Sequence, residues 1–565
     1  MRGHSSYDCF ILFNICAWAT GVKITEGWFY CCFLLANILT FYLQAIVKAA
    51  PTMGRNFTES SNWNEVSTLL RVNLIGGFDS RYPSHNQLYV PEMVHVVTLV
   101  AALGSTLVRK TLYGIVINLL QSLYLARAEE APPTEIKRLL DDFTRDDVLQ
   151  LFGLARSTGT SEYTSTDAFH DRVAIQNQEK LTGMLCDILT ASAGTTGKCG
   201  VSPIYSPPYP PSVGLLNVWR ARWMSLATAT AFQFSSTVQM RAFTALGCLG
   251  TADVDDDFFY QMLVALNTAM FKMENGDTLP IVSMLRSISK IVPAVRGQSR
   301  FFPGMFWIAV ALLQSSHMAF YLEAGRLMFT IISKMEKEGM FANDLMSSVL
   351  MDARLGMEHI ASQLDSTVKL SFDANFSLAL VPIIFKGVRH EGLKNGALRV
   401  LRTLLTVSGN AWRRCVANGT QQETSPGSVP ADSLGYFLAL LPYSTSPPAF
   451  RDLLHLAQVD SVWLEQSARK GVWDDENWIP RIPLSLLGIQ NDHNETAMFA
   501  ASFVGGMVSS SHAQDAETEM LFGLLSEMSS TFPEIISLVY VLFLLCSNNQ
   551  LTPSKILYLC GNDQE

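Results

Sequence analysis

Residues 253–257 read DVDDD, and carboxylates at close spacing can bind Ca²⁺. An EF-hand loop needs ligands at alternating positions, a glycine at the sixth position and a glutamate at the twelfth. Counted from Asp253, these two positions hold Phe258 and Val264, so the calcium loop does not fit. Consecutive aspartates instead favour the acidic first turn of a helix that begins near Phe258, where they would cap free N–H groups and complement the helix dipole.

Other residue types with metal or catalytic chemistry do not converge in the sequence. The ten cysteines show no metal-ligand spacing, and no histidine lies four residues from another histidine or a cysteine. Phosphate-binding glycine loops, the GxSxG nucleophile motif and the HExxH zinc motif are absent. We therefore expect no cofactor, no metal and no enzyme activity. The net charge of −9 gives no basic footprint for nucleic acid.

One basic cluster stands out in this chain of negative net charge. It consists of Lys386, Arg389, His390, Lys394, Arg399 and Arg402, with Glu391 as the opposing acidic residue. Lys394, Arg399 and Arg402 would line part of a helix-pair edge and meet an acidic partner or anionic lipid headgroups. The alternative is an ordinary solvated helix face.

Two further sets of residues are candidates for partner binding or modification. Trp219 and Trp223 lie four residues apart and so share a helix face, either as core residues or as a protein-binding hot spot. Ser-Pro pairs occur at Ser202, Ser206, Ser425 and Ser446. These serines are candidates for phosphorylation, although polar loops commonly contain such pairs.

The elements that position these residues are predicted to be helices. The chain has 565 residues, of which 48% are hydrophobic and 16% charged, a composition too apolar for disorder. In the stretch TLYGIVINLLQSLYL the apolar residues follow one another at spacings of three and one, on one helical face: Leu112, Ile115, Val116, Leu119, Leu120 and Leu123. Similar helix pairs recur along the chain and strand signals are weak. This pattern predicts an all-α fold, a HEAT/armadillo-like α-solenoid of stacked helix pairs.

Breaker-rich stretches divide the chain. The predicted order is an apolar N-terminal segment (1–55), first helical repeats (60–193), a Pro-rich loop (194–214), central helical repeats (215–417), a polar linker (418–433) and C-terminal helices (434–565).

The apolar N-terminal segment contains 21 uncharged residues, 27–47, which is the length that a bilayer span needs. Three interpretations are open: a membrane anchor, a buried pair of core helices, or a boundary misread in the gene. With the anchor, the chain would be a single-pass membrane protein. Without it, the scattered cysteines favour reduced thiols in a cytoplasmic protein.

Several long blocks resemble one protein family. They include EMVHVVTLVAALGSTLVRKTLYGIVINLLQSL, FQFSSTVQMRAFTALGCLG, MFWIAVALLQ and LSFDANFSLALVPIIFKGVRH followed by RVLRTLLTV. In this order they look like the carboxy-terminal helical-repeat region of neurofibromin-type Ras GTPase-activating proteins, whose fungal counterparts restrain the Ras–cAMP pathway. The resemblance covers about residues 63–415 and continues more loosely to about residue 545.

The resemblance implies a non-catalytic scaffold, peripheral to membranes, that supports homodimerisation and the docking of protein partners. In this family a separate domain with an arginine finger and an FLRxxxPA-type motif promotes GTP hydrolysis. That motif does not occur here, so we expect Ras to be engaged only through a GAP domain outside this sequence, which would make the chain a fragment of a larger protein. The alternative function is a membrane-anchored helical-repeat adaptor unrelated to GAP activity.

Overall fold

The computed structural model describes residues 90–103, 106–125, 134–154, 168–193, 211–233, 236–251, 254–271, 278–315, 317–354, 372–421, 428–444 and 446–459, with residues 70, 465 and 466. The chain divides into two compact units, the first ending at Ala294 and the second beginning at Val295. The segment 1–55 and most of the predicted C-terminal helices after residue 459 lie outside the described residues.

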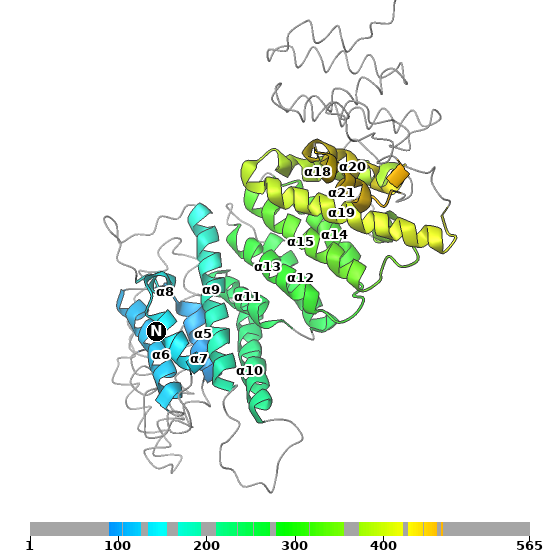
Figure 1. The fold of residues 1–565 in the computed structure, drawn as a ribbon. Helices are drawn as coiled ribbons and strands as arrows, with labels where there is room; N and C mark the ends of the chain where they lie inside the picture. The colour runs from blue at the N-terminus through cyan, green and yellow to red at the C-terminus, as the bar shows by residue number, and fades with distance from the viewer. Residues whose placement is uncertain are drawn as a thin grey trace, which may run out of the picture. The chain divides into compact units, whose positions relative to one another are not determined.

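The first unit consists of helices (Figure 1). They are α5 (Val90–Val100), α6 (Thr106–Leu125), α7 (Thr134–Phe143), α8 (Asp146–Leu151), α9 (Ala168–Ala193), α10 (Pro211–Gln233), α11 (Ser236–Leu249), α12 (Asp256–Phe271), α13 (Leu279–Ile291) and the 3-10 helix η5 (Val292–Ala294).

The second unit is also helical. Its elements are α14 (Phe302–Leu313), α15 (Met318–Lys337), α16 (Met346–Asp352), α18 (Phe372–Val388), α19 (Glu391–Ala417), η6 (Ala431–Ser433), α20 (Leu434–Leu440), η7 (Leu441–Tyr443) and α21 (Pro447–Leu456). Consecutive helices pack in pairs, α14 on α15 and α18 on α19, and α15 also packs on α19. The described residues contain no β-strand, and the predicted all-α solenoid of stacked helix pairs is confirmed.

Helices α11 and α12 follow one another in the chain, but each makes its main contacts with other helices. Helix α11 packs on α10 and α13, whereas α12 packs on α13. The reason lies at Gly247, where a Cβ atom would be 2.9 Å from the Cα of Ser287. The missing side chain lets the α11 and α13 backbones approach closely. The Thr244 and Ser283 hydroxyls, 3.0 Å apart, join the two helices beside this contact.

The aspartates that precede α12 act as a helix cap. Asp255 Oδ1 accepts a hydrogen bond from the Phe258 amide over 2.7 Å, and Asp256 and Asp257 occupy the first turn. The capping role predicted for this run is therefore confirmed for Asp255, while Asp256 and Asp257 lie where the helix dipole favours negative charge. Asp253 lies outside the described residues. Within the described ranges, no three His, Cys, Asp or Glu side chains gather as metal ligands.

Helix α5 forms the centre of the first unit, because every residue in it except Met93 is buried. Its apolar sequence suits this environment, but it also carries Glu92, His95 and Thr98. Helices α6, α9, α10 and α11 surround it. Buried polar groups are costly unless they are hydrogen-bonded, so the surrounding helices must supply partners.

Three of the surrounding helices do so. From α10, Arg222 forms an ion pair of 2.6 Å with Glu92, and the Thr230 hydroxyl lies 3.0 Å from His95 Nε2. From α9, Gln178 donates to the Thr98 carbonyl over 2.6 Å. From α11, Arg241 donates to the Ala101 carbonyl over 2.7 Å, just beyond the C-terminal end of α5. Helices α9, α10 and α11 are thereby each held in one register against α5.

Acidification should destabilise the first unit, because His95 is buried in its neutral form. Burial lowers the pKa of His95 from 6.5 to about 3. Between these values the unfolded chain binds a proton that the folded chain excludes, so the free energy of unfolding falls as the pH drops. From about pH 7.5 to about pH 5.5 the loss is about 1.4 kcal/mol.

Urea unfolding of the wild type and of His95→Gln at both pH values measures this contribution. Other groups, including Glu92, titrate in both proteins, so the difference between the two isolates His95. The variant should lose about 1.4 kcal/mol less than the wild type over the interval. An identical loss in both proteins would show that His95 is protonated in the folded state.

Candidate functional site

The predicted basic cluster lies in the second unit, at the end of α18 and along α19. Lys386 donates to the Ser315 carbonyl over 2.8 Å and to the Gln314 carbonyl over 3.4 Å. It therefore caps the C-terminal end of α14, where the helix dipole favours a cation. Arg389 and His390 are exposed in the turn between α18 and α19.

The basic residues of α19 contact different neighbours. Lys394 lies over the Tyr443 ring, with Nζ 4.8 Å from the ring centroid. Arg399 lies over the Phe329 ring of α15, with Cζ 3.9 Å from the centroid. Arg402 is exposed one turn further along the helix. The structure thus brings Arg399, and not Lys394, to α15.

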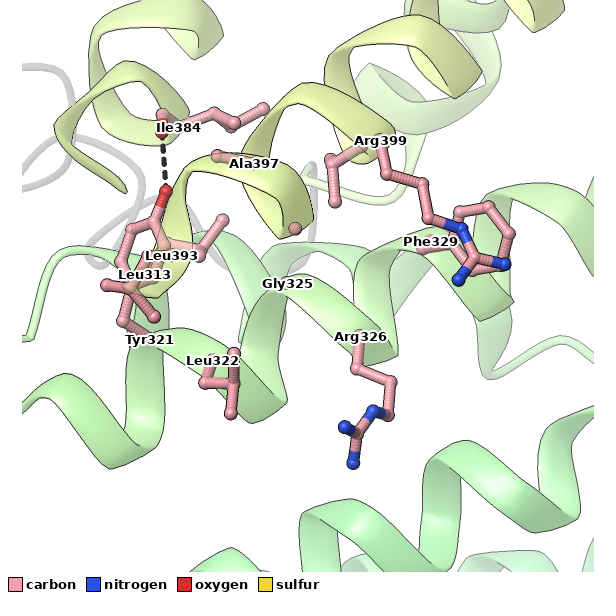
Figure 2. A pocket seen from close by; sticks show the side chains of 12 residues that line it. Leu313, Tyr321, Leu322, Gly325, Arg326, Phe329, Ile384, Leu393, Ala397 and Arg399 are labelled. Carbon is pink, nitrogen blue, oxygen red and sulfur yellow. Dashed lines mark hydrogen bonds between the residues drawn. The ribbon is translucent and has the colours of Figure 1, made fainter. Parts of the chain in front are cut away.

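A groove of about 170 Å³ opens beside Arg399. Helices α14, α15, α18 and α19 line it with Leu313, Tyr321, Leu322, Gly325, Arg326, Phe329, Ile384, Leu393, Gly396, Ala397, Arg399 and Val400. Figure 2 shows the Arg399 guanidinium against the Phe329 ring and Arg326 on the same side of the groove. The lining is therefore mainly apolar, with guanidinium groups at one end.

Two arginines line the groove, and one of them is paired with a carboxylate. Arg326 donates to Glu323 over 2.7 Å, and the Glu323 side chain is only 1% exposed, so this pair is neutral overall. Arg399 forms no ion pair with a carboxylate in the part of the chain that the structure describes.

Tyr321 closes the other end of the groove (Figure 2). Its hydroxyl donates to the Ile384 carbonyl and accepts a hydrogen bond from the Gly387 amide over 3.1 Å. Burial raises the pKa of Tyr321 well above its usual value. The hydroxyl is thus engaged twice and stays protonated. Among the described residues, the groove lining contains no nucleophile next to a base.

Trp219 and Trp223 lie on one face of α10, as their spacing predicts. Their side chains are 3% and 0% exposed, and α10 packs on α5, α9 and α11. This burial favours the core interpretation, since a partner could reach these rings only if the helices separated.

Of the candidate phosphorylation sites, the structure describes Ser446. It is the exposed N-cap of α21, and its hydroxyl accepts a hydrogen bond from the Ala449 amide over 3.4 Å. Ser202, Ser206 and Ser425 lie outside the described residues, as does the apolar run 27–47. Phosphorylation at these serines stays a prediction. Among the helices that are described, none has both the length and the apolar character needed to cross a bilayer.

No sequence pattern marks Tyr321, Arg326 and Phe329 as parts of a groove. The available hint was a pair of glycines, Gly325 and Gly396, inside strongly helical stretches. Glycine weakens a helix by about 0.5–1 kcal/mol relative to alanine, so its presence there calls for a reason.

Two yeast proteins are similar to this chain. Inhibitory regulator protein IRA2 of Saccharomyces cerevisiae is 21% identical over 379 residues, which cover 65% of this chain and 11% of IRA2. Inhibitory regulator protein IRA1 of the same yeast is 20% identical over 394 residues, with coverages of 66% and 11%. The chain therefore corresponds to only a small part of either relative.

No protein-family model matches the chain. Among solved structures, an engineered protein covers 92% of this chain and 97% of its own, at 13% identity. Its TM-score of 0.29 is too low to support any inference. The distant similarity to IRA2 and IRA1 supports the resemblance to fungal inhibitory regulators. The closer correspondence to a neurofibromin-type carboxy-terminal region stays a prediction.

Two glycine substitutions near the groove should shift stability in opposite directions. A Cβ at Gly387 would overlap the ring and hydroxyl of the buried Tyr321, so Gly387→Ala should destabilise the chain by about 1–3 kcal/mol. A Cβ at Gly396 would meet no atom within 4 Å, so Gly396→Ala should stabilise it by about 0.5–1 kcal/mol. Urea unfolding measures both changes. Equal stability of the two variants would contradict this packing of Tyr321 against α18.

Proposed function

We propose that this chain is a non-catalytic helical scaffold within a neurofibromin-like negative regulator of Ras. The observation that carries the proposal is the similarity of about two-thirds of the chain to the two inhibitory regulators. The described residues fit this role, since they form stacked helix pairs whose interior is occupied by packing side chains. Such arrays serve chiefly as extended binding surfaces.

The proposed scaffold would act on Ras only through another domain. Acceleration of GTP hydrolysis depends on an arginine that stabilises charge on the transferred phosphoryl group. Two arginines of the second unit serve the fold instead. Arg354 stacks on Trp307 and Phe372, and Arg414 forms a two-point ion pair with Glu336.

A two-part experiment tests this function. The purified chain, added to GTP-loaded Ras, should leave the rate of phosphate release at its intrinsic value. In the organism that carries the gene, deleting the coding sequence for residues 90–459 should raise the fraction of Ras bound to GTP. Unchanged Ras-GTP after the deletion would contradict a regulatory role, and accelerated phosphate release would contradict a non-catalytic one.

The exposed face of α12 supports the proposal of homodimerisation. Tyr260, Val264 and Phe271 lie at helical spacing on this face and are 53%, 45% and 85% exposed. From Phe258 to Phe271 the helix carries no charge. An uncharged stripe with large exposed side chains is typical of association surfaces.

If α12 contributes to a dimer, Phe271→Glu should shift the purified chain toward the monomer. Sedimentation equilibrium would show a dissociation constant at least about tenfold weaker, which corresponds to about 1.4 kcal/mol. Gln261→Glu on the same helix adds the same charge beside this stripe and is the control. A chain that is monomeric without substitution, or a dimer insensitive to Phe271→Glu, would rule out this surface.

A further inference from the structure

The groove between α15 and α19 contains two glycines that the fold does not need. A Cβ on Gly396 would meet no atom within 4 Å, and a Cβ on Gly325 would have Val400 as its nearest neighbour, at 4.0 Å. Both positions would accept alanine with a gain in helix stability. The two glycines therefore serve no packing purpose, and their effect is to keep the groove open. A departure from local helix preference without structural benefit is expected at functional sites.

The size of the groove suits one apolar side chain. Its volume is about 170 Å³. An apolar cavity of about 150 Å³ accommodates a benzene ring. Leu322, Leu393 and Val400 supply apolar contacts for such a group. Burying a leucine or phenylalanine side chain there removes apolar surface from water and so favours binding.

Arg399 is prepared to bind a carboxylate at the end of this groove. Phe329 covers one face of its guanidinium and restricts its motion. Stacking leaves the N–H groups at the edge of the plane available, in the fork geometry that pairs with a carboxylate. Arg402 adds a second exposed cation one turn away on the same helix. The local charge is thus positive on a chain whose net charge is −9.

We propose that this groove binds an acidic segment of a protein partner, which inserts one leucine- or phenylalanine-sized side chain between α15 and α19 and places a carboxylate on Arg399. The inference rests on the proposed function as a docking scaffold and specifies the chemistry of one partner. A concave site that receives a single side chain fits a protein segment better than the flat surface of a membrane. Charge complementarity selects an acidic segment.

The test uses the complete 565-residue chain as bait for random peptides displayed on phage. Enriched peptides should combine acidic residues with a leucine, phenylalanine or methionine. The best peptide is then synthesised with a fluorescein label, and its dissociation constant is measured by fluorescence anisotropy. Because the contact is partly electrostatic, affinity should also fall as the salt concentration rises.

Two variants and two matched controls locate the binding site. Arg399→Glu reverses the charge at the groove. Gly396→Leu adds a side chain to the groove lining, at a position whose Cβ meets no atom within 4 Å. Each should weaken binding at least about tenfold, or about 1.4 kcal/mol. The controls are Arg413→Glu, at an exposed position further along α19, and Gly183→Leu, at a glycine of α9 with equally open surroundings. Both controls should bind within about twofold of the wild type.

Several outcomes would overturn the inference. They are the absence of enriched peptides, enriched peptides without acidic residues, and binding that survives Gly396→Leu. Phosphatidylserine vesicles provide the remaining comparison. If no peptide binds, and vesicle binding is lost in Arg399→Glu but kept in Gly396→Leu, then Arg399 binds anionic lipid headgroups and not a protein segment. None of these results bears on the Ras-GTP measurement. Peptide binding at the groove can therefore be disproved while the proposed function stands, and the proposed function can be disproved while peptide binding stands.

Discussion

The burial of α5 is the constraint on which the first unit depends. Removing this helix from water leaves the carbonyls at its C-terminal end without solvent, and Arg241 of α11 supplies a donor to two of them, those of Leu99 and Ala101. The partial negative charge of a helix C-terminus compensates the buried cation in part. Burial still lowers the pKa of Arg241 to about 10, which leaves it charged at neutral pH. Because a buried cation without partners would be strongly destabilising, α11 has one position that it can occupy against α5.

The same constraint operates in the second unit through other residues. Glu336 of α15 pairs at two points with Arg414 of α19, and Trp307 of α14 donates to the Leu350 carbonyl of α16 over 2.7 Å. Apolar stripes bring helices together with little preference for register, since many apolar contacts are interchangeable. Polar groups within the interfaces do have a preference, because each needs a partner at hydrogen-bonding distance. Fold class is therefore set by hydrophobic periodicity, and the alignment of neighbouring helices by a few buried polar contacts.

These separate roles of hydrophobic periodicity and polar contacts explain what could be predicted from the sequence. Periodicity located the helices, and the aspartates correctly marked the start of α12. The choice of neighbours was harder, because periodicity identifies the buried face of a helix but not the helix that covers it. The packing of α11 on α13 required knowledge of the close approach at Gly247.

Lys386 illustrates the same limit. In the sequence it belongs to a surface cluster, whereas in the structure it donates to the Ser315 carbonyl, 71 residues earlier in the chain and just past the end of α14. The groove was missed because four separate helices contribute to it.

The low identity to the two inhibitory regulators has a physical meaning in this architecture. Cores built from stacked helix pairs tolerate exchange among apolar residues of similar volume, so 20–21% identity is compatible with a common fold. The same tolerance means that the core says little about function, because many sequences would build it. Functional positions should then be those whose residue is explained neither by helix stability nor by packing. Gly325 and Gly396 are such positions, since alanine at either would strengthen the helix and disturb nothing nearby. Gly325 lies on α15 and Gly396 on α19, so both positions line one groove beside Arg399, where the proposed partner would dock.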